Sequence, residues 1–357
     1  MKDYKKVIIA LSGGVDSAVA AALLKKQGFE VAGVFFRFFS SRTSSFQAKK
    51  ISKKLGISLK IIDARKEFKK RVIDYFIASY KKGLTPNPCV ACNKEMKFQV
   101  LFDLMKKYKA DYVATGHYAR LGREFSIFNF QFSNNSKISK FSNTKLLEAK
   151  DKNKDQSYFL YRLTQKDLAK IIFPLGDYRK SEVKKIAKKM KLPVAENESQ
   201  DICFVAENSI GDFLKKNIKS KIGEIREIGG NILGKHKGLP FYTIGQRKGI
   251  EIGGTGPYWV IGKNVLKNEL VVTDDPKKLF TDKFWVNQVN WVNQKVKFPL
   301  RAKIRIRYRA EKFSAIIRKV RGEKLEVRSE RFLRAVTPGQ AAVFYKNGEV
   351  LGGGVII

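Results

Sequence analysis

A glycine-rich turn near the N-terminus contains the first residues that could do chemistry. An apolar run over 7–11 leads into Ser12-Gly13-Gly14-Val15-Asp16-Ser17, and a helix-forming run over 18–27 follows at once. Glycines let backbone approach an anion closely, and N–H groups at a helix start favour negative charge. The turn lacks the lysine of a GxxxxGK[ST] loop. The segment therefore predicts a phosphate site of another kind, with an ordinary glycine turn as the alternative.

The cysteines are the second chemically capable group. Cys89 and Cys92 follow two prolines, which predict an extended stretch over 85–92, and Cys203 lies far along the chain. We expect Cys92 to open a helix, whose N-terminus, with Lys94 and Lys97, would lower the thiol pKa. The spacing leaves four interpretations open. They are a zinc site completed by His117, a redox pair of Cys89 and Cys92, a sulfur-transfer pair, and inert buried thiols.

A basic run near the C-terminus indicates an anionic partner. Residues 301–310 alternate strictly, so a strand would place Arg301, Lys303, Arg305, Arg307 and Arg309 on one face. Like charges in one row repel unless they meet an anion, and a nucleic acid backbone is the natural one. A solvated barrel face is the alternative.

Composition limits the class of protein. The 357 residues include 72 Lys and Arg against 33 Asp and Glu, a formal charge of +39. This balance favours a nucleic acid partner, although a lysine-rich composition throughout would also explain it. Three cysteines do not make a disulfide scaffold, which fits a reducing cytoplasm. No apolar run long enough for a membrane span and no signal peptide are expected.

Alternating strand and helix patterns must position the N-terminal groups. Strands are predicted over 7–11, 30–36, 59–63 and 111–115, and helices over 18–27, 47–55, 66–82 and 97–107. This order predicts a doubly wound parallel sheet, in which ligands bind beyond the carboxyl ends of strands. The Ser12 turn and Thr115-Gly116-His117 both fall at such ends.

The rest of the chain changes character twice. Residues 123–145 read as an insertion, a hairpin or loose loop, and 183–191 as a helix that Ser181 would start. Glycine-rich short strands follow, and then an all-β region with a hairpin signal at Asn347-Gly348. We expect an α/β domain over 1–206, a small central α+β domain over 207–281 that binds tRNA, and a C-terminal β-barrel over 282–357.

The order of these features resembles the bacterial tRNA-specific 2-thiouridylases, within the pyrophosphate-loop superfamily of ATP pyrophosphatases. The resemblance covers nearly the whole chain. The matching blocks are 11–17 (LSGGVDS), 85–98 (TPNPCVACNKEMKF), 115–120 (TGHYAR), 154–161 (KDQSYFLY), 173–176 (FPLG), 199–204 (SQDICF), 242–254 (YTIGQRKGIEIGG), 307–309 (RYR) and 337–340 (TPGQ).

The resemblance implies ATP-dependent placement of sulfur on the C2 position of the wobble uridine of tRNA. Cys92 matches the family nucleophile, and Cys203 matches the cysteine that carries a persulfide. The implied ATP and Mg²⁺ site comprises Ala10, Leu11, Ser12, Gly13, Gly14, Val15, Asp16, Ser17, Phe36 and Gly116. The implied tRNA contacts are Asn87, Pro88, Cys89, His117, Lys154, Asp155, Gln156, Arg307, Tyr308 and Gln340. The implied partner is a sulfur-donor protein, either a cysteine desulfurase or a relay. No membrane association and no metal-ligating residues are implied.

Two departures from the family pattern matter. Cys89 stands where some members have an aspartate with a suggested acid/base role, and 37–42 lacks the usual acidic, tryptophan-bearing stretch. Three other functions are weighed: an amide-forming ATP pyrophosphatase, a non-catalytic RNA-binding protein, and a thiolase whose three cysteines hold an iron–sulfur cluster. The first needs neither the cysteines nor the basic run, and the second leaves the Ser12 turn without purpose.

Overall fold

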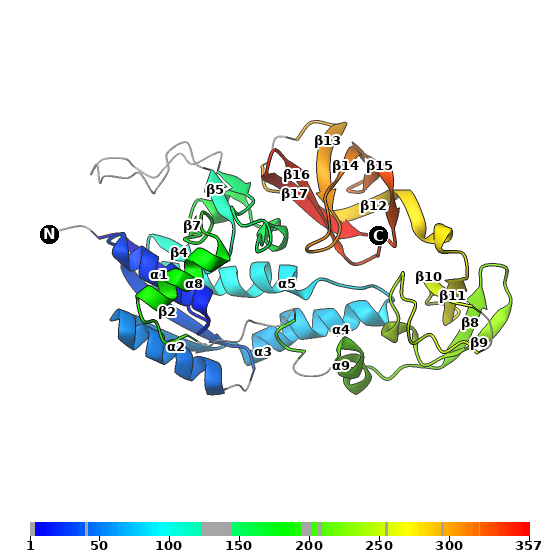
Figure 1. Cartoon of the computed structure of the whole chain (residues 1–357), viewed down its shortest axis with the longest axis horizontal. Coiled ribbons are helices and arrows are strands. Elements are labelled where there is room, and N and C mark those ends of the chain that lie inside the picture. Colours follow the sequence, from blue (N-terminus) through cyan, green and yellow to red (C-terminus); the bar gives the residue numbers. More distant parts are fainter. Residues whose placement is uncertain are drawn as a thin grey trace.

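The computed structural model describes residues 4–39, 42–122, 144–194, 202–205, 209–253, 256–293, 296–320 and 322–357. Three sheets make up these parts (Figure 1). The N-terminal parallel sheet lies on the left of the view, a C-terminal barrel at upper right, and a small sheet at lower right. Within the described residues, no helix is both long and apolar enough to cross a bilayer.

The N-terminal sheet has the predicted parallel, doubly wound form. Its strand order is β3-β2-β1-β4-β7. Val7 and Ile9 pack in a cluster with residues of α1, α2 and α8, whereas Ile8 packs in another with residues of α6. The strands are β1 (Lys6–Ala10), β2 (Glu30–Arg37), β3 (Ser58–Asp63), β4 (Tyr112–Ala114) and β7 (Ile171–Ile172). Both faces are covered because alternate side chains of a strand point to opposite faces.

The helices follow the predicted order, with one correction at the start of α8. They are α1 (Val15–Lys26), α2 (Arg42–Leu55), α3 (Arg65–Phe68) continued by η1 (Lys69–Ile73) and α4 (Asp74–Lys81), α7 (Gln165–Leu168), α8 (Lys180–Lys189), and the short turn η4 (Ser157–Leu160). Helix α8 is capped by Arg179 rather than started by Ser181, and the Glu182 carboxylate accepts the Arg179 N–H at 2.6 Å.

The cysteine segment is helical rather than extended. A continuous helix runs from α5 (Pro88–Ala91) through η2 (Cys92–Phe98), which is π-helical, to α6 (Gln99–Lys107). Asn87 caps it, its side-chain oxygen accepting the Val90 N–H at 3.4 Å, and Pro88 occupies the first turn. The predicted extended stretch over 85–92 was therefore wrong from Pro88 onward, because Asn followed by Pro is a helix-start signal.

The C-terminal strands close into the predicted barrel. The order β12-β15-β14-β13-β16-β17 is closed by pairing of β12 with β17. The strands are β12 (Phe280–Trp291), β13 (Leu300–Arg305), β14 (Phe313–Lys319), β15 (Leu325–Arg334), β16 (Ala341–Lys346) and β17 (Glu349–Ile356). The hairpin at Asn347-Gly348 is confirmed, with φ of 51° and 79° at these residues.

The predicted basic row does not form as one strand. β13 ends at Arg305, and 306–309 turn away from the sheet. The Arg305 side chain is only 12% exposed, and its guanidinium pairs with Asp155 at 3.4 Å and Glu148 at 3.9 Å. Lys312 reaches the same Glu148 at 2.6 Å. The prediction was wrong because Arg305 meets carboxylates of the N-terminal half, which fix the barrel to it.

The predicted insertion is flanked by two paired strands. β5 (Arg120–Gly122) and β6 (Lys145–Leu147) are antiparallel, and β6 also pairs with β17, which extends the barrel sheet. Residues 123–143 of the predicted insertion lie outside the described residues.

The central part holds helix α9 (Ile210–Asn217), the turns η5 (Leu239–Phe241) and η6 (Pro276–Leu279), and a four-stranded sheet of order β10-β11-β8-β9. The strands are β8 (Gly223–Glu227), β9 (Ile232–His236), β10 (Trp259–Asn264) and β11 (Glu269–Thr273). Its own buried cluster includes Ile225, Val260 and Leu270.

Candidate active site

One cavity of about 1640 Å³ gathers most of the predicted site residues. Its walls come from the Ser12 turn, the end of β2, residues 85–97, residues 115–118, Cys203 and the barrel residues Arg307, Tyr308 and Gln340. Among the residues proposed from sequence, Gly13 and Asp155 do not line it. Segments far apart in the chain therefore meet at the carboxyl edge of the parallel sheet, where ligands of such sheets bind.

The Ser12 turn is held in shape by its two serines. The Ser17 hydroxyl donates to the Gly14 carbonyl at 3.0 Å and accepts the Ser12 N–H at 3.1 Å. Gly116 packs against this turn so closely that a Cβ there would lie 2.8 Å from the Ser17 backbone nitrogen. Only glycine fits at position 116 without moving the backbone of the turn.

Asp16 belongs to an ion pair that the sequence did not reveal. The Lys180 ammonium lies 2.6 and 2.7 Å from the two Asp16 carboxylate oxygens, and the Tyr118 hydroxyl donates to the carboxylate at 2.7 Å. Lys180 begins α8 and lines the cavity. The residues next to Lys180 in the sequence do not indicate that it pairs with Asp16. Only the folded chain brings the start of α8 beside the turn.

The cysteines share the cavity but differ in environment. Cys92 is buried among Phe68, Val72 and Met96, whereas Cys203 is exposed. Burial raises the pKa of Cys92 to about 12, against a smaller lowering by Lys97. The expected acidification of Cys92 was therefore wrong, since desolvation of the thiolate outweighs the nearby charges. Lys94 pairs instead with Asp167 at 2.7 Å.

Cys203 lies within electrostatic reach of Cys92. Ionised Cys203 and Cys89 each raise the pKa of the Cys92 thiol. Phe204 packs against the cluster that contains Cys92, which brings the two segments together. Desolvation by surrounding atoms raises the pKa of Cys203 as well. Among the described residues, no group of three or more His, Cys, Asp and Glu is arranged to hold a metal.

His117 is buried at the back of the site. Its Nδ1 shares a hydrogen bond with the Thr115 hydroxyl at 2.7 Å, and the Phe98 ring stacks on it with centroids 6.1 Å apart. Burial, with a smaller effect of Lys97, lowers its pKa to about 3. The imidazole is therefore neutral at physiological pH.

The depressed pKa of His117 predicts acid sensitivity. Below pH 6.5 the unfolded chain takes up a proton that folded His117 refuses until about pH 3. The free energy of unfolding then falls by up to about 1.4 kcal/mol per pH unit. We expect His117→Asn, which cannot titrate, to lose this part of the slope. Thermal unfolding at pH 7.5 and 5.5 should show the gap between wild type and variant shrinking; a constant gap would contradict the assignment.

The barrel reaches the cysteine segment through one turn. The Thr85 N–H donates to the Pro338 carbonyl at 2.9 Å, and the Gln340 amide donates to the Thr85 carbonyl at 2.8 Å. Arg307 donates to the Thr337 hydroxyl at 2.6 Å. The turn over 337–340 therefore supports the entry to α5.

Residues 154–156 are fixed by a buried carboxylate. Asp155 accepts the N–H groups of Ala149 at 3.0 Å and Ser157 at 3.2 Å. Lys154 and Gln156 on either side line the cavity, and the side-chain amide oxygen of Gln156 accepts the Tyr118 N–H at 3.0 Å. Asp155 thus orients its neighbours and does not itself face the cavity.

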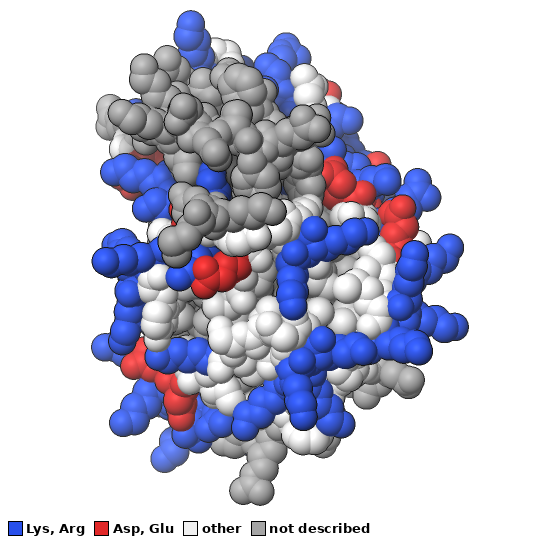
Figure 2. Space-filling view, turned by 90° about the vertical axis from the view of Figure 1, so that its left-hand side faces the viewer, with Lys and Arg blue, Asp and Glu red and all other residues white. Residues whose placement is uncertain are grey.

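The cavity is basic. Asp16 is the one carboxylate among its lining residues in the described chain, beside Arg37, Lys97, Lys154, Lys180, Lys184, Lys188, Lys191, Arg307 and Arg309. Figure 2 shows that lysines and arginines are also spread over the face on the left of Figure 1, around an uncharged centre and with few acidic groups. Because positive charge occurs on other faces as well, charge alone does not locate a binding site. The main cavity stands out because it is both basic and concave.

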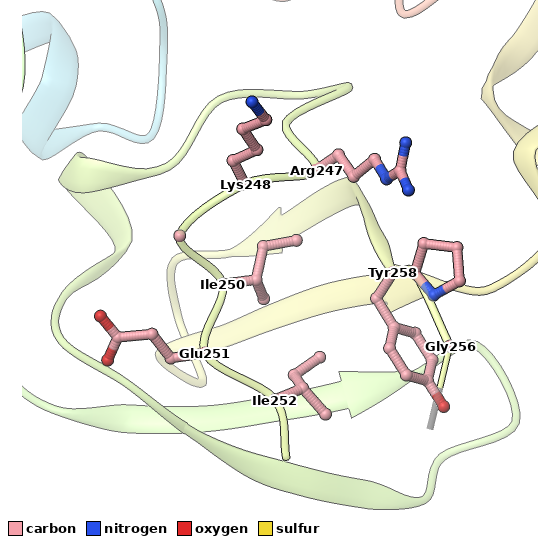
Figure 3. Close-up of a pocket in the computed structure, with 9 residues that line it drawn as sticks. Arg247, Lys248, Ile250, Glu251, Ile252, Gly256 and Tyr258 are labelled. Carbon is pink, nitrogen blue, oxygen red and sulfur yellow. The ribbon is translucent and has the colours of Figure 1, made fainter. Parts of the chain in front are cut away.

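A second, smaller pocket lies in the central part (Figure 3). It has a volume of about 470 Å³ and lies along the loop 247–258. Arg247 and Lys248 lie at one end of the view, and Ile252 at the other. Glu251 is tied to Lys237 at 2.7 Å. The loop thus presents two cations beside an apolar floor.

The fold and the main cavity define a nucleotide-binding α/β protein with an appended basic barrel. Residues 5–207 match the model of the tRNA methyl transferase HUP domain, 211–274 its PRC-barrel domain, and 281–356 the aminomethyltransferase β-barrel domain. The chain belongs to the tRNA-specific 2-thiouridylase family.

Full-length relatives support this membership. The tRNA-specific 2-thiouridylase MnmA 1 of Thermoanaerobacter pseudethanolicus is 39% identical, covering 100% of this chain and 99% of its own. The tRNA-specific 2-thiouridylase MnmA of Clostridioides difficile is 40% identical, with 99% and 98% covered. MnmA 2 of Clostridium botulinum is 37% identical, with 98% of each covered.

Proposed function

We propose that this protein is an ATP-dependent sulfurtransferase that converts the wobble uridine of tRNA to 2-thiouridine. The observation that carries the proposal is that the Ser12 turn, Cys92, Cys203 and barrel arginines all line the main cavity. An amide-forming ATP pyrophosphatase has no use for the two thiols, and a non-catalytic RNA-binding protein has none for the turn.

The turn serves the activation step. A uridine C2 carbonyl oxygen is a poor leaving group, so its attack on the ATP α-phosphate, with loss of pyrophosphate, makes it part of AMP, which leaves readily. Backbone N–H groups at the start of α1 suit the charge of the departing pyrophosphate. Phe36 lines the same cavity and offers a ring on which adenine can stack.

The chain offers Mg²⁺ one carboxylate, Asp16, within this cavity. That number fits the ion, which commonly combines one or two carboxylates with substrate phosphates. Asp16 is now paired with Lys180, and transfer of that ammonium to a phosphate would release the carboxylate. When bound, the ion neutralises charge on the phosphates.

The cysteines serve the sulfur step. The terminal sulfur of a Cys203 persulfide attacks C2 and displaces AMP, and the Cys92 thiolate then attacks the Cys203 sulfur. The product leaves as 2-thiouridine, and a Cys92–Cys203 disulfide remains, which an external thiol must reduce. In the alternative order, Cys92 first releases sulfide, which attacks C2. Both orders need the two thiols to meet.

The remaining assignments complete the proposal. Residues 1–206 form the catalytic domain, 207–281 a central tRNA-binding domain, and 282–357 the barrel. The loop that carries Arg247 and Lys248 supports RNA contact by the central part. A sulfur-donor protein, a cysteine desulfurase or relay, charges Cys203, whose exposure allows access. Since the chemistry needs reduced thiols, we place it in the cytoplasm.

The decisive experiment is mass spectrometry of tRNA nucleosides after incubation with the protein, ATP and a persulfide source. The expected product is 2-thiouridine at the wobble position, with AMP and pyrophosphate formed in equal amounts. Absence of the product while ATP and tRNA still bind would exclude the proposal. Iron and sulfide analysis of anaerobically purified protein tests the iron–sulfur alternative.

Arg307→Ala should weaken tRNA binding. Arg307 lines the cavity, although one of its nitrogens is held by Ala335 and Thr337. Losing one phosphate contact should lower the salt slope of binding by about one. Arg301→Ala is the matched control, since that side chain is 80% exposed on β13, outside the cavity. Equal slopes for wild type and Arg307→Ala would remove Arg307 from the interface.

A further inference from the structure

The π-helical turn η2 places one lysine on the same side as Cys92. In this turn the backbone bonds join residues five apart, so residue 97 lies nearer to the face of residue 92 than it would in an α-helix. In an α-helix, residues three and four apart share a face instead. π-turns are rare and occur often at functional sites. Lys97 and Cys92 accordingly both line the main cavity.

Lys97 differs from the neighbouring Lys94. Lys94 is committed to Asp167, whose other partner is the Thr164 N–H at 2.8 Å. Lys97 has no hydrogen-bond or ion-pair partner within the described part of the chain, and it faces a cavity whose one carboxylate, Asp16, is held by Lys180. A partly buried ammonium without a counter-ion is suited to an anion that forms only during the reaction.

The groups around the two thiols show which anion this is. Cys89 on α5 and His117 after β4 are the titratable side chains beside Cys92, Cys203 and Lys97, whereas α3 and η1 contribute Phe68 and Val72. Arg37, at the end of β2, lines the same cavity. Lys97 lowers the pKa of both Cys92 and Cys203, and it also disfavours protonation of His117. Its charge therefore reaches both sulfur atoms.

We propose that Lys97 is the positioning residue that stabilises the sulfur anions of this site, the Cys92 thiolate and the persulfide anion on Cys203. Because Cys92 is buried and the atoms around Cys203 raise its pKa as well, neither thiol ionises readily alone, and a nearby fixed cation offsets part of that cost. The role rests on the proposed sulfur transfer, but thiol ionisation can be measured without tRNA.

The test is the pH dependence of alkylation of Cys92 and Cys203 by iodoacetamide, read by peptide mass spectrometry in a Cys89→Ser background. Lys97→Met should slow both reactions about tenfold at pH 8 and shift both rate profiles to higher pH. Lys97→Arg should restore most of the rate. Lys94→Met, the matched control, should behave like the parent.

Single-turnover thiolation with saturating tRNA adds a second measurement. Lys97→Met should lose about tenfold at pH 8 and recover as the pH rises, a pattern that a merely structural defect would not give. Unchanged alkylation rates at pH 8 in Lys97→Met, or a defect in Lys97→Arg as large as in Lys97→Met, would overturn the assignment. If the unmodified protein makes no 2-thiouridine, the proposed function fails while the alkylation result still decides the role of Lys97.

Discussion

Cys92→Ser and Cys203→Ser should each reduce 2-thiouridine formation by at least about 10³-fold. The two sulfur atoms lie in one cavity, and the proposed reaction uses one as carrier and the other as nucleophile. A serine hydroxyl neither carries a persulfide nor forms a disulfide, so neither variant has a substitute route. The measurement is thiolated tRNA per turnover by mass spectrometry.

The two variants should fail at different steps. After treatment with a persulfide donor, Cys92→Ser should retain one added sulfur on the Cys203 peptide, whereas Cys203→Ser should carry none there. Both should bind ATP and tRNA as the unmodified protein does, because Cys92 is buried and serine is similar in size. Normal thiolation by either variant would contradict the two-cysteine reaction.

Gly116→Ala should disable the ATP site without touching a reacting group. The added Cβ would lie 2.8 Å from the Ser17 nitrogen and 2.9 Å from the Asp16 carbonyl carbon. Both are backbone atoms at the start of α1, so the anion-binding turn must move. Such overpacking costs about 2 kcal/mol, or roughly thirtyfold in ATP affinity. Titration of ATP by calorimetry measures it.

Gly234→Ala is the matched control for this change. Gly234 lies in β9, and a Cβ there meets no atom within 4 Å. This variant should bind ATP with unchanged affinity and unfold at a similar temperature. If Gly116→Ala also binds ATP normally, the turn is not the phosphate site that its geometry indicates.

Local sequence determined most of the elements. The strand and helix order of the N-terminal sheet, the glycine-rich turn before α1 and the hairpin at Asn347-Gly348 are predictable, because each depends on neighbouring residues. Asn87 and Pro88 also carry the signal for the start of α5, although the two prolines of this stretch equally predict an extended chain. The alternation over 301–310 predicts which side chains share one face of a strand. It does not predict where the strand ends or which groups that face contacts, and here β13 ends at Arg305, which pairs with Asp155 and Glu148.

The pKa of Cys92 and the ion pairs of the lysines could not be predicted from neighbouring residues. Cys92 has the charged neighbours of an acidic thiol, yet burial under Phe68 and Val72 raises its pKa. Lys94 and Lys97 look equivalent in sequence, but Asp167, distant in the chain, removes one from the site.

The sequence by itself thus determined the glycine-rich turn, the positions of the three cysteines and the excess of positive charge. Only the tertiary structure decided that Lys180 pairs with Asp16, that Arg305 pairs with Asp155, and that Lys97 lines the same cavity as the two thiols. The physical reason is that desolvation and ion pairing depend on which distant segments pack together, and a local pattern carries no record of that.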